Sequence, residues 1–176
     1  VRVEANPAAQ TVGTIEQRVI FAGSKEKRAV LNTLLADKSL ERVIIFSRTK
    51  HGADRVAKNL AADGHEAAAI HGNKSQNARQ AALKGFASGQ VRLLVATDIA
   101  ARGIDVPNIT HVINFELPRS PKDYIHRIGR TGRADASGEA ISLITPDDEH
   151  HFGVIQKKMG KHVEMIESAV LQLTGF

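Results

Sequence analysis

The chain has 176 residues, which is the length of one ordinary domain rather than two. Hydrophobic residues make up 42% and charged residues 24%, a balance typical of a folded domain and unlike that of a disordered chain. The absence of cysteine excludes disulfides, thiolate zinc sites and a cysteine nucleophile. The formal net charge of +5 favours an anionic partner without identifying it.

The sequence shows no signal for a membrane or for secretion. Its longest apolar runs, such as 43–46 and 93–96, are far shorter than the roughly 20 residues that span a bilayer. The first residues contain neither a methionine nor an apolar leader. We therefore expect a piece of a longer, cytoplasmic protein that does not contact a membrane.

Strands and helices are expected to alternate after an N-terminal arm. Residues 1–15 show little periodicity and are expected to be an arm or a remnant of an interdomain linker. Strands are expected at residues 16–21, 42–46, 66–70, 91–95, 110–114 and 139–144. Helices are expected from a cap at Ser24, at about 50–62, from a cap at Ser75 to residue 87, and at 154–159.

This alternation predicts one α/β domain at residues 16–165, followed by a tail at 166–176. Strands separated by helices form a mostly parallel sheet with helices on both faces. In such folds the loops at the carboxyl ends of the strands meet the ligand. Candidate site residues should therefore follow the expected strands.

The densest pattern is a set of arginines near residue 130. Arg127, Arg130 and Arg133 are spaced three apart, and Gly129 and Gly132 precede two of them. Three like charges on one side of a helix or turn repel one another, and a bound anion relieves this repulsion. The glycines leave room for a phosphate beside the guanidinium groups. The pattern predicts an anion site, and the alternative is a solvated basic face.

A second set of polar residues follows the strand expected at 91–95. Thr97 and Asp98 begin a helical turn whose hydroxyl and backbone amides can hold a phosphate. Arg102 and Asp105 follow, three residues apart. The alternative is a helix cap at Thr97 or Asp98 together with a local pair of Arg102 and Asp105.

Two further sets follow the strands expected at 42–46 and 66–70. Their members are Ser47, Arg48, Thr49 and Lys50 in the first, and His71, Gly72, Asn73, Lys74, Ser75, Gln76 and Arg79 in the second. Hydroxyls, amides and cations suit the phosphates of a nucleic-acid backbone better than they suit base edges. Helix capping explains Thr49 and Ser75 equally well, and a cap can coexist with binding.

The sequence lacks the parts that would let this chain bind ATP by itself. It contains neither Gly-x-x-x-x-Gly-Lys-Ser/Thr nor an acidic magnesium-binding segment after a strand. Arginines suited to a γ-phosphate therefore suggest arginine fingers that act on ATP bound by another domain. The eight histidines show no metal-binding spacing, so we expect no metal site in this chain.

Taken together, these segments resemble the second RecA-like domain of the DEAD-box ATP-dependent RNA helicases. The similar segments are 43–49 (VIIFSRT), His71-Gly72, Gln76-x-x-Arg79, 96–105 (ATDIAARGID) and 126–133 (HRIGRTGR). The sequence of residues 71–76 is most similar to that of the bacterial RhlE-type branch. The resemblance implies a RecA-like three-layer α/β domain, with helices on both faces of a mostly parallel sheet.

The resemblance also implies roles for single residues. Arg130 and Arg133 are the expected catalytic fingers on the γ-phosphate of ATP. Four residues are expected to bind ATP or couple the domains: Asp105 at the ribose, Arg102 joining the domains, and His126 and Arg127 linking closure to hydrolysis. The residues expected to hold the RNA backbone are Thr49, Lys50, Gly72, Asn73, Gln76, Arg79 and Thr97.

The expected cofactor is ATP with Mg²⁺, bound mainly by a first RecA-like domain of the same chain, which is missing here. RNA, rather than DNA, is implied as a partner by the resemblance alone, and we expect a monomer. Asn73 stands where many family members have an aspartate. This chain alone is not expected to hydrolyse ATP. The alternatives are a non-enzymatic RNA- or protein-binding module of the same fold and a DNA-translocating relative.

Overall fold

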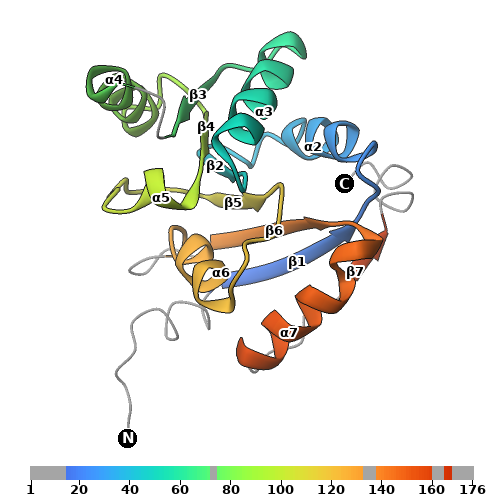
Figure 1. The fold of residues 1–176 in the computed structure, drawn as a ribbon. Helices are drawn as coiled ribbons and strands as arrows, with labels where there is room; N and C mark the ends of the chain where they lie inside the picture. The colour runs from blue at the N-terminus through green and yellow to red at the C-terminus, as the bar shows by residue number, and fades with distance from the viewer. Residues whose placement is uncertain (1–14, 72–74, 133–137, 160–164, 168–176) are drawn as a thin grey trace, which may run out of the picture.

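The molecule is built on a seven-stranded sheet whose pairings in the described ranges are all parallel. The computed structural model describes residues 15–71, 75–132, 138–159 and 165–167. The strands are β1 (Ile15–Phe21), β2 (Val43–Phe46), β3 (Ala67–Ile70), β4 (Leu93–Ala96), β5 (His111–Asn114), β6 (Gly138–Ile144) and β7 (Met165–Glu167). Their order is β3-β4-β2-β5-β6-β1-β7 (Figure 1).

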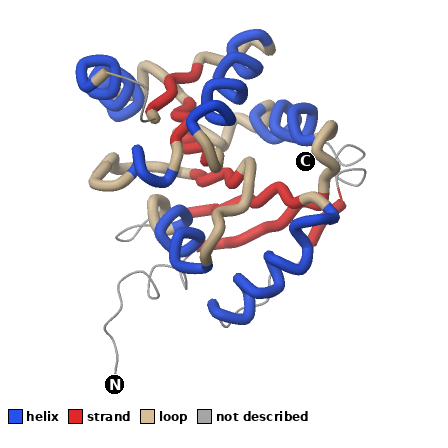
Figure 2. Tube along the Cα trace, viewed as in Figure 1, coloured by secondary structure: helices blue, strands red, loops and turns tan. Residues whose placement is uncertain are grey.

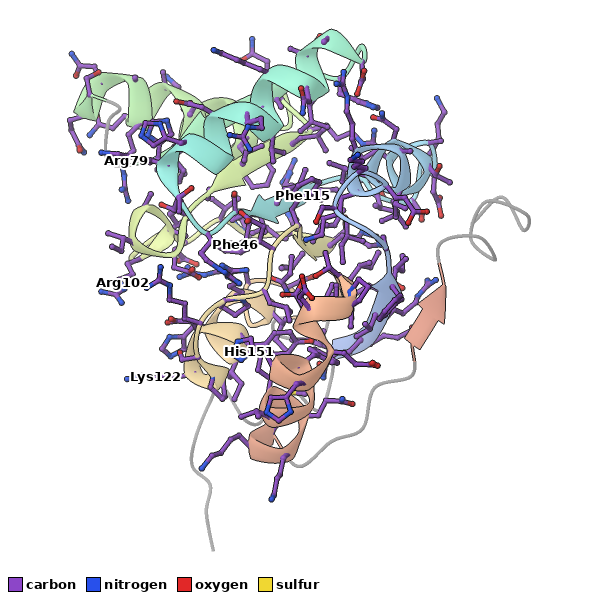
Figure 3. The ribbon with its side chains drawn as sticks, turned by 45° about the vertical axis from the view of Figure 1, so that its right-hand side comes forward. Phe46, Arg79, Arg102, Phe115, Lys122 and His151 are labelled. Atoms are coloured by element: carbon purple, nitrogen blue, oxygen red, sulfur yellow. The ribbon has the colours of Figure 1, made fainter. Side chains whose placement is uncertain are left out.

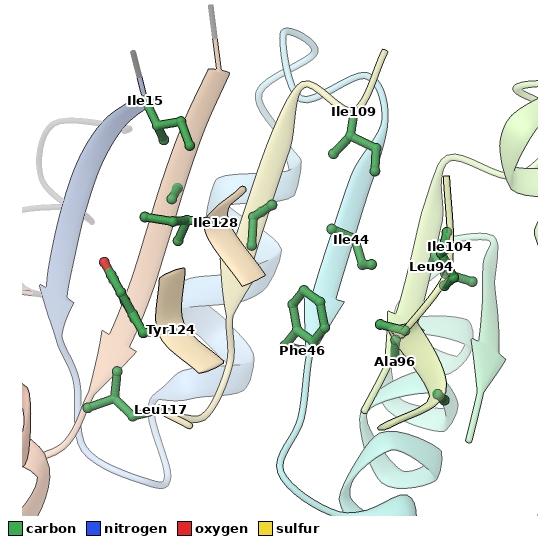
Figure 4. Packing of buried hydrophobic residues seen from close by; sticks show 14 of the residues in the cluster. Ile15, Ile44, Phe46, Leu94, Ala96, Ile104, Ile109, Leu117, Tyr124 and Ile128 are labelled. Atoms are coloured by element: carbon green, nitrogen blue, oxygen red, sulfur yellow. The ribbon is translucent and has the colours of Figure 1, made fainter. Parts of the chain in front are cut away.

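Helices cover both faces of this sheet, as the alternation predicted. On one face pack α4 (Gln76–Ala87), α5 (Asp98–Ala101), α6 (Pro121–Ile128) and α7 (Glu149–Met159), and on the other α2 (Lys27–Leu35) and α3 (Lys50–Ala62) (Figures 1 and 2). Because side chains alternate along a strand, β2 contributes Phe46 to the first core and Ile45 to the second. Figure 4 shows Phe46 in the first core, which also contains Tyr124 and Ile128 of α6.

Several elements differ from the sequence prediction, and three of the differences concern α2, α7 and β7. The cap expected at Ser24 is wrong, because α2 begins at Lys27 after Glu26, whose carboxylate accepts the N–H of Gly23 at 2.9 Å. Helix α7 begins before residue 154, directly after the 3₁₀ turn η2 (Pro146–Asp148). Strand β7 was not expected, and it continues beyond residue 165 while pairing with β1.

Within the described ranges, no helix is long and apolar enough to cross a lipid bilayer. The sheet and its two helical layers instead supply the apolar packing, with Val19, Ile44 and Phe152 among the fully buried side chains.

Candidate functional site

The predicted site residues come together because three neighbouring strands end at the same level. In the sheet register, Phe46 at the end of β2 lies opposite Ala96 of β4 and Asn114 of β5. The chain therefore leaves the sheet at three adjacent points, and the loops that follow carry polar residues. This edge is the carboxyl edge of the sheet, where parallel α/β folds bind ligands.

Three hydroxyls at this edge cap helices, which confirms the capping that the sequence analysis allowed for Thr49, Ser75 and Thr97. Thr49 Oγ1 accepts from the N–H of Gly52 at 3.0 Å, and Ser75 Oγ accepts from Ala78 at 3.1 Å. Thr97 Oγ1 accepts from the N–H of Ala100 at 3.4 Å. Each hydroxyl oxygen accepts a hydrogen bond in its cap and keeps its own O–H as a donor, so capping leaves it able to bind a phosphate oxygen.

Arg127 is buried and forms the centre of the site, although the sequence pattern placed it among ligand-facing arginines. Its side chain is 1% exposed, and its Nε and Nη2 donate to Oδ1 and Oδ2 of Asp98 at 2.7 and 2.8 Å. Its Nη1 donates to Asn114 Oδ1 at 3.1 Å and to the Glu116 carbonyl at 2.6 Å. The guanidinium also lies 5.0 Å from the centre of the Phe46 ring. A solvated basic face is therefore wrong for Arg127.

Arg127 and Arg130 do not share one face, because α6 ends at Ile128. Arg127 lies in the last turn of the helix and points into the core, whereas Arg130 follows the helix in a turn. Arg130 is partly buried, and its Nη1 donates to the Ile104 carbonyl at 2.6 Å. Gly132 has a φ of 65°, the left-handed conformation that glycine adopts without strain. Arg133 lies outside the described residues.

Glu116 joins two loops of the site, and sequence reasoning missed it. Its Oε1 accepts from the Ser47 hydroxyl at 2.6 Å and from the N–H of Arg48 at 3.0 Å. In return, Nε and Nη2 of Arg48 donate to the Leu117 carbonyl at 3.1 and 2.8 Å. The loop after β2 and the loop after β5 are thus latched to each other. An acidic residue two positions after a fully buried strand was the available signal.

The latch also sets the charge state of Glu116. Burial by itself raises the pKa of this carboxyl, whereas the hydrogen bonds from Arg48 and Ser47 lower it. The positive charges of Lys27 and Arg48 lower it further, so the pKa lies below its usual value. Glu116 is therefore ionised at neutral pH and holds the latch as a carboxylate.

Two hollows open at this edge, and Asp98 lines both. The smaller, of about 30 Å³, is lined by Phe46, Asp98, Ala101, Arg102, Asp123, His126, Arg127 and Arg130. The larger, of about 430 Å³, is a groove lined by Arg48, Lys50, Thr97, Asp98, Ile99, Arg102, Arg119 and Asp123. Of the residues expected at the ATP or between the domains, Arg102, His126, Arg127 and Arg130 line the smaller hollow, and Arg102 also lines the larger. Two of those expected at the RNA, Lys50 and Thr97, line the larger hollow. Arg119 was not predicted as a site residue, and Arg48 was named only as a member of the polar set that follows β2.

The remaining predicted residues that the structure describes are Gln76, Arg79 and Asp105. Gln76 is exposed, and Arg79 is half-buried on α4, where its Nη2 lies 3.5 Å from the Arg102 carbonyl. Figure 3 shows Arg79 and Arg102 on the same side of the molecule. Asp105 is exposed in the loop after α5. Gly72 and Asn73 lie outside the described residues. Among the side chains the structure describes, no group of three or more His, Asp or Glu is arranged to hold a metal ion.

Gly52→Ala is expected to break the latch, because a Cβ at residue 52 lies 2.5 Å from Ser47 Oγ and 3.2 Å from Glu116 Oε1. We expect a loss of about 1–3 kcal/mol in the free energy of unfolding, measured by urea denaturation. The matched control is Gly153→Ala in α7, where a Cβ meets nothing within 4 Å. It is expected to stabilise the domain by about 0.5–1 kcal/mol. Equal shifts for the two variants would contradict the close contact.

Arg127→Ala is expected to lower the free energy of unfolding by about 3 kcal/mol or more, because it leaves Asp98 and Asn114 without their donor. Arg102→Ala serves as the control, since Arg102 is exposed. Its effect should stay within about 0.5 kcal/mol. Urea denaturation of both variants tests the difference, and similar losses would rule out a central role for Arg127.

Comparisons with known proteins place this chain in a family. A model of the helicase conserved C-terminal domain matches residues 26–135. The ATP-dependent RNA helicase RhlB of Vibrio parahaemolyticus is 44% identical over 173 residues, which are 97% of this chain and 40% of that protein. RhlB of Actinobacillus succinogenes is 40% identical over 161 residues, 92% of this chain and 39% of that protein. The chain thus spans about two fifths of these relatives, whose name gives no support to the RhlE-type branch.

Solved structures agree with this placement. The Escherichia coli DEAD-box protein SrmB, bound to regulator of ribonuclease activity A, has a TM-score of 0.76 at 37% identity, over 87% of this chain and 89% of that one. The C-terminal domain of the DEAD-box protein Dbp5 has a TM-score of 0.79 at 34% identity, over 89% of this chain and 91% of that one. The chain therefore belongs to the helicase conserved C-terminal domain family, as the C-terminal RecA-like domain of a DEAD-box protein.

Proposed function

We propose that this domain is the second half of an ATP-dependent RNA helicase. It binds the RNA backbone and supplies arginine fingers to ATP held by a first RecA-like domain. The observation that carries this proposal is the pair of hollows at the carboxyl edge, one lined by Arg130 and the other by Lys50 and Thr97, with Asp98 in both. The S. cerevisiae Dbp5 structure bound to RNA and ADP BeF3 supports it, with a TM-score of 0.84 at 32% identity, over 94% of this chain and 44% of that one.

RNA binding rests on the cations and hydroxyls of the larger groove and of α4. Thr49, Lys50 and Thr97 donate to phosphate oxygens, and Gln76 and Arg79 extend the contact along α4. Gly72 and Asn73 are proposed to complete it. Contacts of this kind read the backbone and not the bases, so sequence preference should be small.

ATP binding rests on the smaller hollow. Arg130, with Arg133, is proposed to neutralise charge on the γ-phosphate during its transfer, and His126 and Arg102 lie on the same hollow. Asp105 is proposed to hold the ribose. Arg127 acts indirectly, by fixing Asp98 and the end of α6. With no carboxylate cluster among the described side chains, Mg²⁺ is proposed to be held by the first domain.

Coupling follows from ligands that are shared between two domains. ATP and RNA each favour the closed arrangement, so each favours binding of the other by the same factor. Closure brings Arg130 to the phosphate and the groove to the RNA. A strand bent by this closure cannot remain in a regular duplex, which separates the strands locally.

Arg130→Ala in the full-length protein is expected to reduce the kcat of RNA-stimulated ATP hydrolysis by about 10³-fold or more, as loss of an arginine finger does. Arg130→Lys should lose most of this rate as well, because an ammonium lacks the guanidinium fork. The control Lys158→Ala on α7 should leave kcat unchanged. Unchanged turnover in Arg130→Ala would reject the finger assignment and favour a non-enzymatic binding module.

Arg79→Ala is expected to weaken binding of single-stranded RNA equally for all sequences and to reduce the slope of log affinity against log salt by about 0.7, because one phosphate contact is lost. Fluorescence anisotropy with oligonucleotides of different sequence measures both quantities. Lys84→Ala, on the same helix and exposed, is the matched control. A loss confined to one RNA sequence would contradict a backbone contact.

A further inference from the structure

We propose that the larger groove holds one complete RNA nucleotide, with Arg119 on its phosphate and Ile99 against its ribose or base. This inference rests on the proposed function and adds two contacts to it. The groove is bounded by the loop after β2, the loop with α5 after β4, and the loop that leads into α6. At about 430 Å³, its volume is that of a small-molecule site.

The charge of the groove selects an anion. It is lined by four cations (Arg48, Lys50, Arg102 and Arg119) and two carboxylates (Asp98 and Asp123). Asp98 is already neutralised, because both of its oxygens accept from the buried guanidinium of Arg127. Arg48 is fixed in place by its two bonds to the Leu117 carbonyl. A surplus of positive charge therefore remains at the groove, and part of it is rigidly positioned.

Ile99 shows that the ligand also has an apolar part. Its side chain is 76% exposed, whereas the next two residues of α5, Ala100 and Ala101, are buried. The other large hydrophobic side chain exposed in the described part of the chain is Val154, at 40%. An exposed isoleucine side chain among four cations makes no favourable contact with a free phosphate. A nucleotide matches the lining, since it joins a phosphate to the apolar faces of a ribose and a base.

Arg119 stands on a segment that is already ordered for binding. The Pro118 carbonyl before it accepts from Nε2 of His151 at 2.8 Å, and the Ser120 hydroxyl after it accepts from the N–H of Asp123 at 3.1 Å. The backbone on both sides of Arg119 is thus tied to α7 and α6. Its guanidinium is exposed at the groove. Little backbone entropy is lost when it contacts a phosphate, so the contact favours binding.

The other occupant to be tested is the missing first domain, which would bury Ile99 against protein. The two occupants are distinguished by whether added RNA shifts the NMR signal of the Ile99 methyl group. The probe is a ten-nucleotide uridylate RNA added to this chain at low salt, with the Ile99 δ1 methyl followed by ¹³C NMR and affinity by anisotropy. We expect the Ile99 methyl to shift together with the amides of Lys50 and Thr97.

The RNA affinities of point variants provide the second measurement. Ile99→Ala and Arg119→Ala are each expected to weaken RNA binding about fivefold, as loss of one small apolar contact or one phosphate contact does. Only Arg119→Ala should also lower the salt slope, by about 0.7 for a single strand. The matched controls are Val154→Ala and Lys157→Ala on α7, which should bind as the parent chain does.

Two results would overturn this inference, and only the second would also reject the proposed RNA-binding function. If the amides of Lys50 and Thr97 shift while the Ile99 methyl stays silent and both variants bind normally, RNA binding stands and another partner covers Ile99. If the parent chain binds no RNA and no signal moves, the proposed RNA-binding function fails together with the nucleotide subsite.

Discussion

The burial of one guanidinium group, that of Arg127, constrains the whole carboxyl edge of the sheet. A buried charge is tolerated only when it is paired and its donors are used. Here the four hydrogen bonds go to Asp98, Asn114 and the Glu116 carbonyl, and the Phe46 ring lies beside the group. Asp98 follows β4, whereas Asn114 ends β5 and Glu116 lies in the loop after it. Satisfying Arg127 therefore fixes the relative positions of the loops after β4 and β5, and of α6.

The loop after β2 joins this arrangement through Glu116. The backbone carbonyl of Glu116 accepts from Arg127, while the carboxylate of Glu116 accepts from Ser47 and Arg48. The buried network thus extends from the helix that precedes Arg130 to the loop that carries Lys50. The candidate ligand-binding residues at this edge therefore lie on backbone segments that hydrogen bonds already hold in place. Such preorganisation reduces the ordering cost of binding.

The same network gives a physical basis for communication between the two hollows. Asp98 lines both of them and is held at both oxygens by Arg127. A ligand that shifts the loop carrying Thr97 acts on the residue that positions the end of α6. Because coupling between two sites is reciprocal, a ligand in one hollow that shifts this network would change binding in the other by the same factor. The exposed charges, Arg102 and Arg119, surround this fixed centre.

Much of the fold could be predicted from the sequence, because period and turn signals are local. The helix expected at about 50–62 and the helix expected from a cap at Ser75 correspond to α3 and α4. The start of α2 was misplaced because Ser24 resembles a cap, while Glu26 performs the local bonding instead. Strand β7 has only three residues and pairs with the distant β1, so its formation depends on tertiary contacts.

The candidate site, like the fold, could be predicted from the sequence only in part. Residues that follow strands, such as Thr49, Lys50 and Thr97, were predicted because the ends of parallel strands share one edge. The sequence could not tell that Arg127 points inward while Arg130 does not, since equal spacing hides the end of α6 at Ile128. Glu116 was missed for a similar reason. Its partners, Ser47 and Arg48, are brought to it only by the pairing of β2 with β5.

The central claim is that this domain completes a shared ATP site without forming one alone. RNA-stimulated ATP hydrolysis, measured for this chain by itself and for the same chain joined to the preceding part of the full-length protein, tests it most directly. The shared site predicts no turnover by the chain alone and RNA-dependent turnover by the joined protein. Turnover by the chain alone would contradict a shared site. A folded, ATP-binding joined protein without turnover would contradict the catalytic role of this domain.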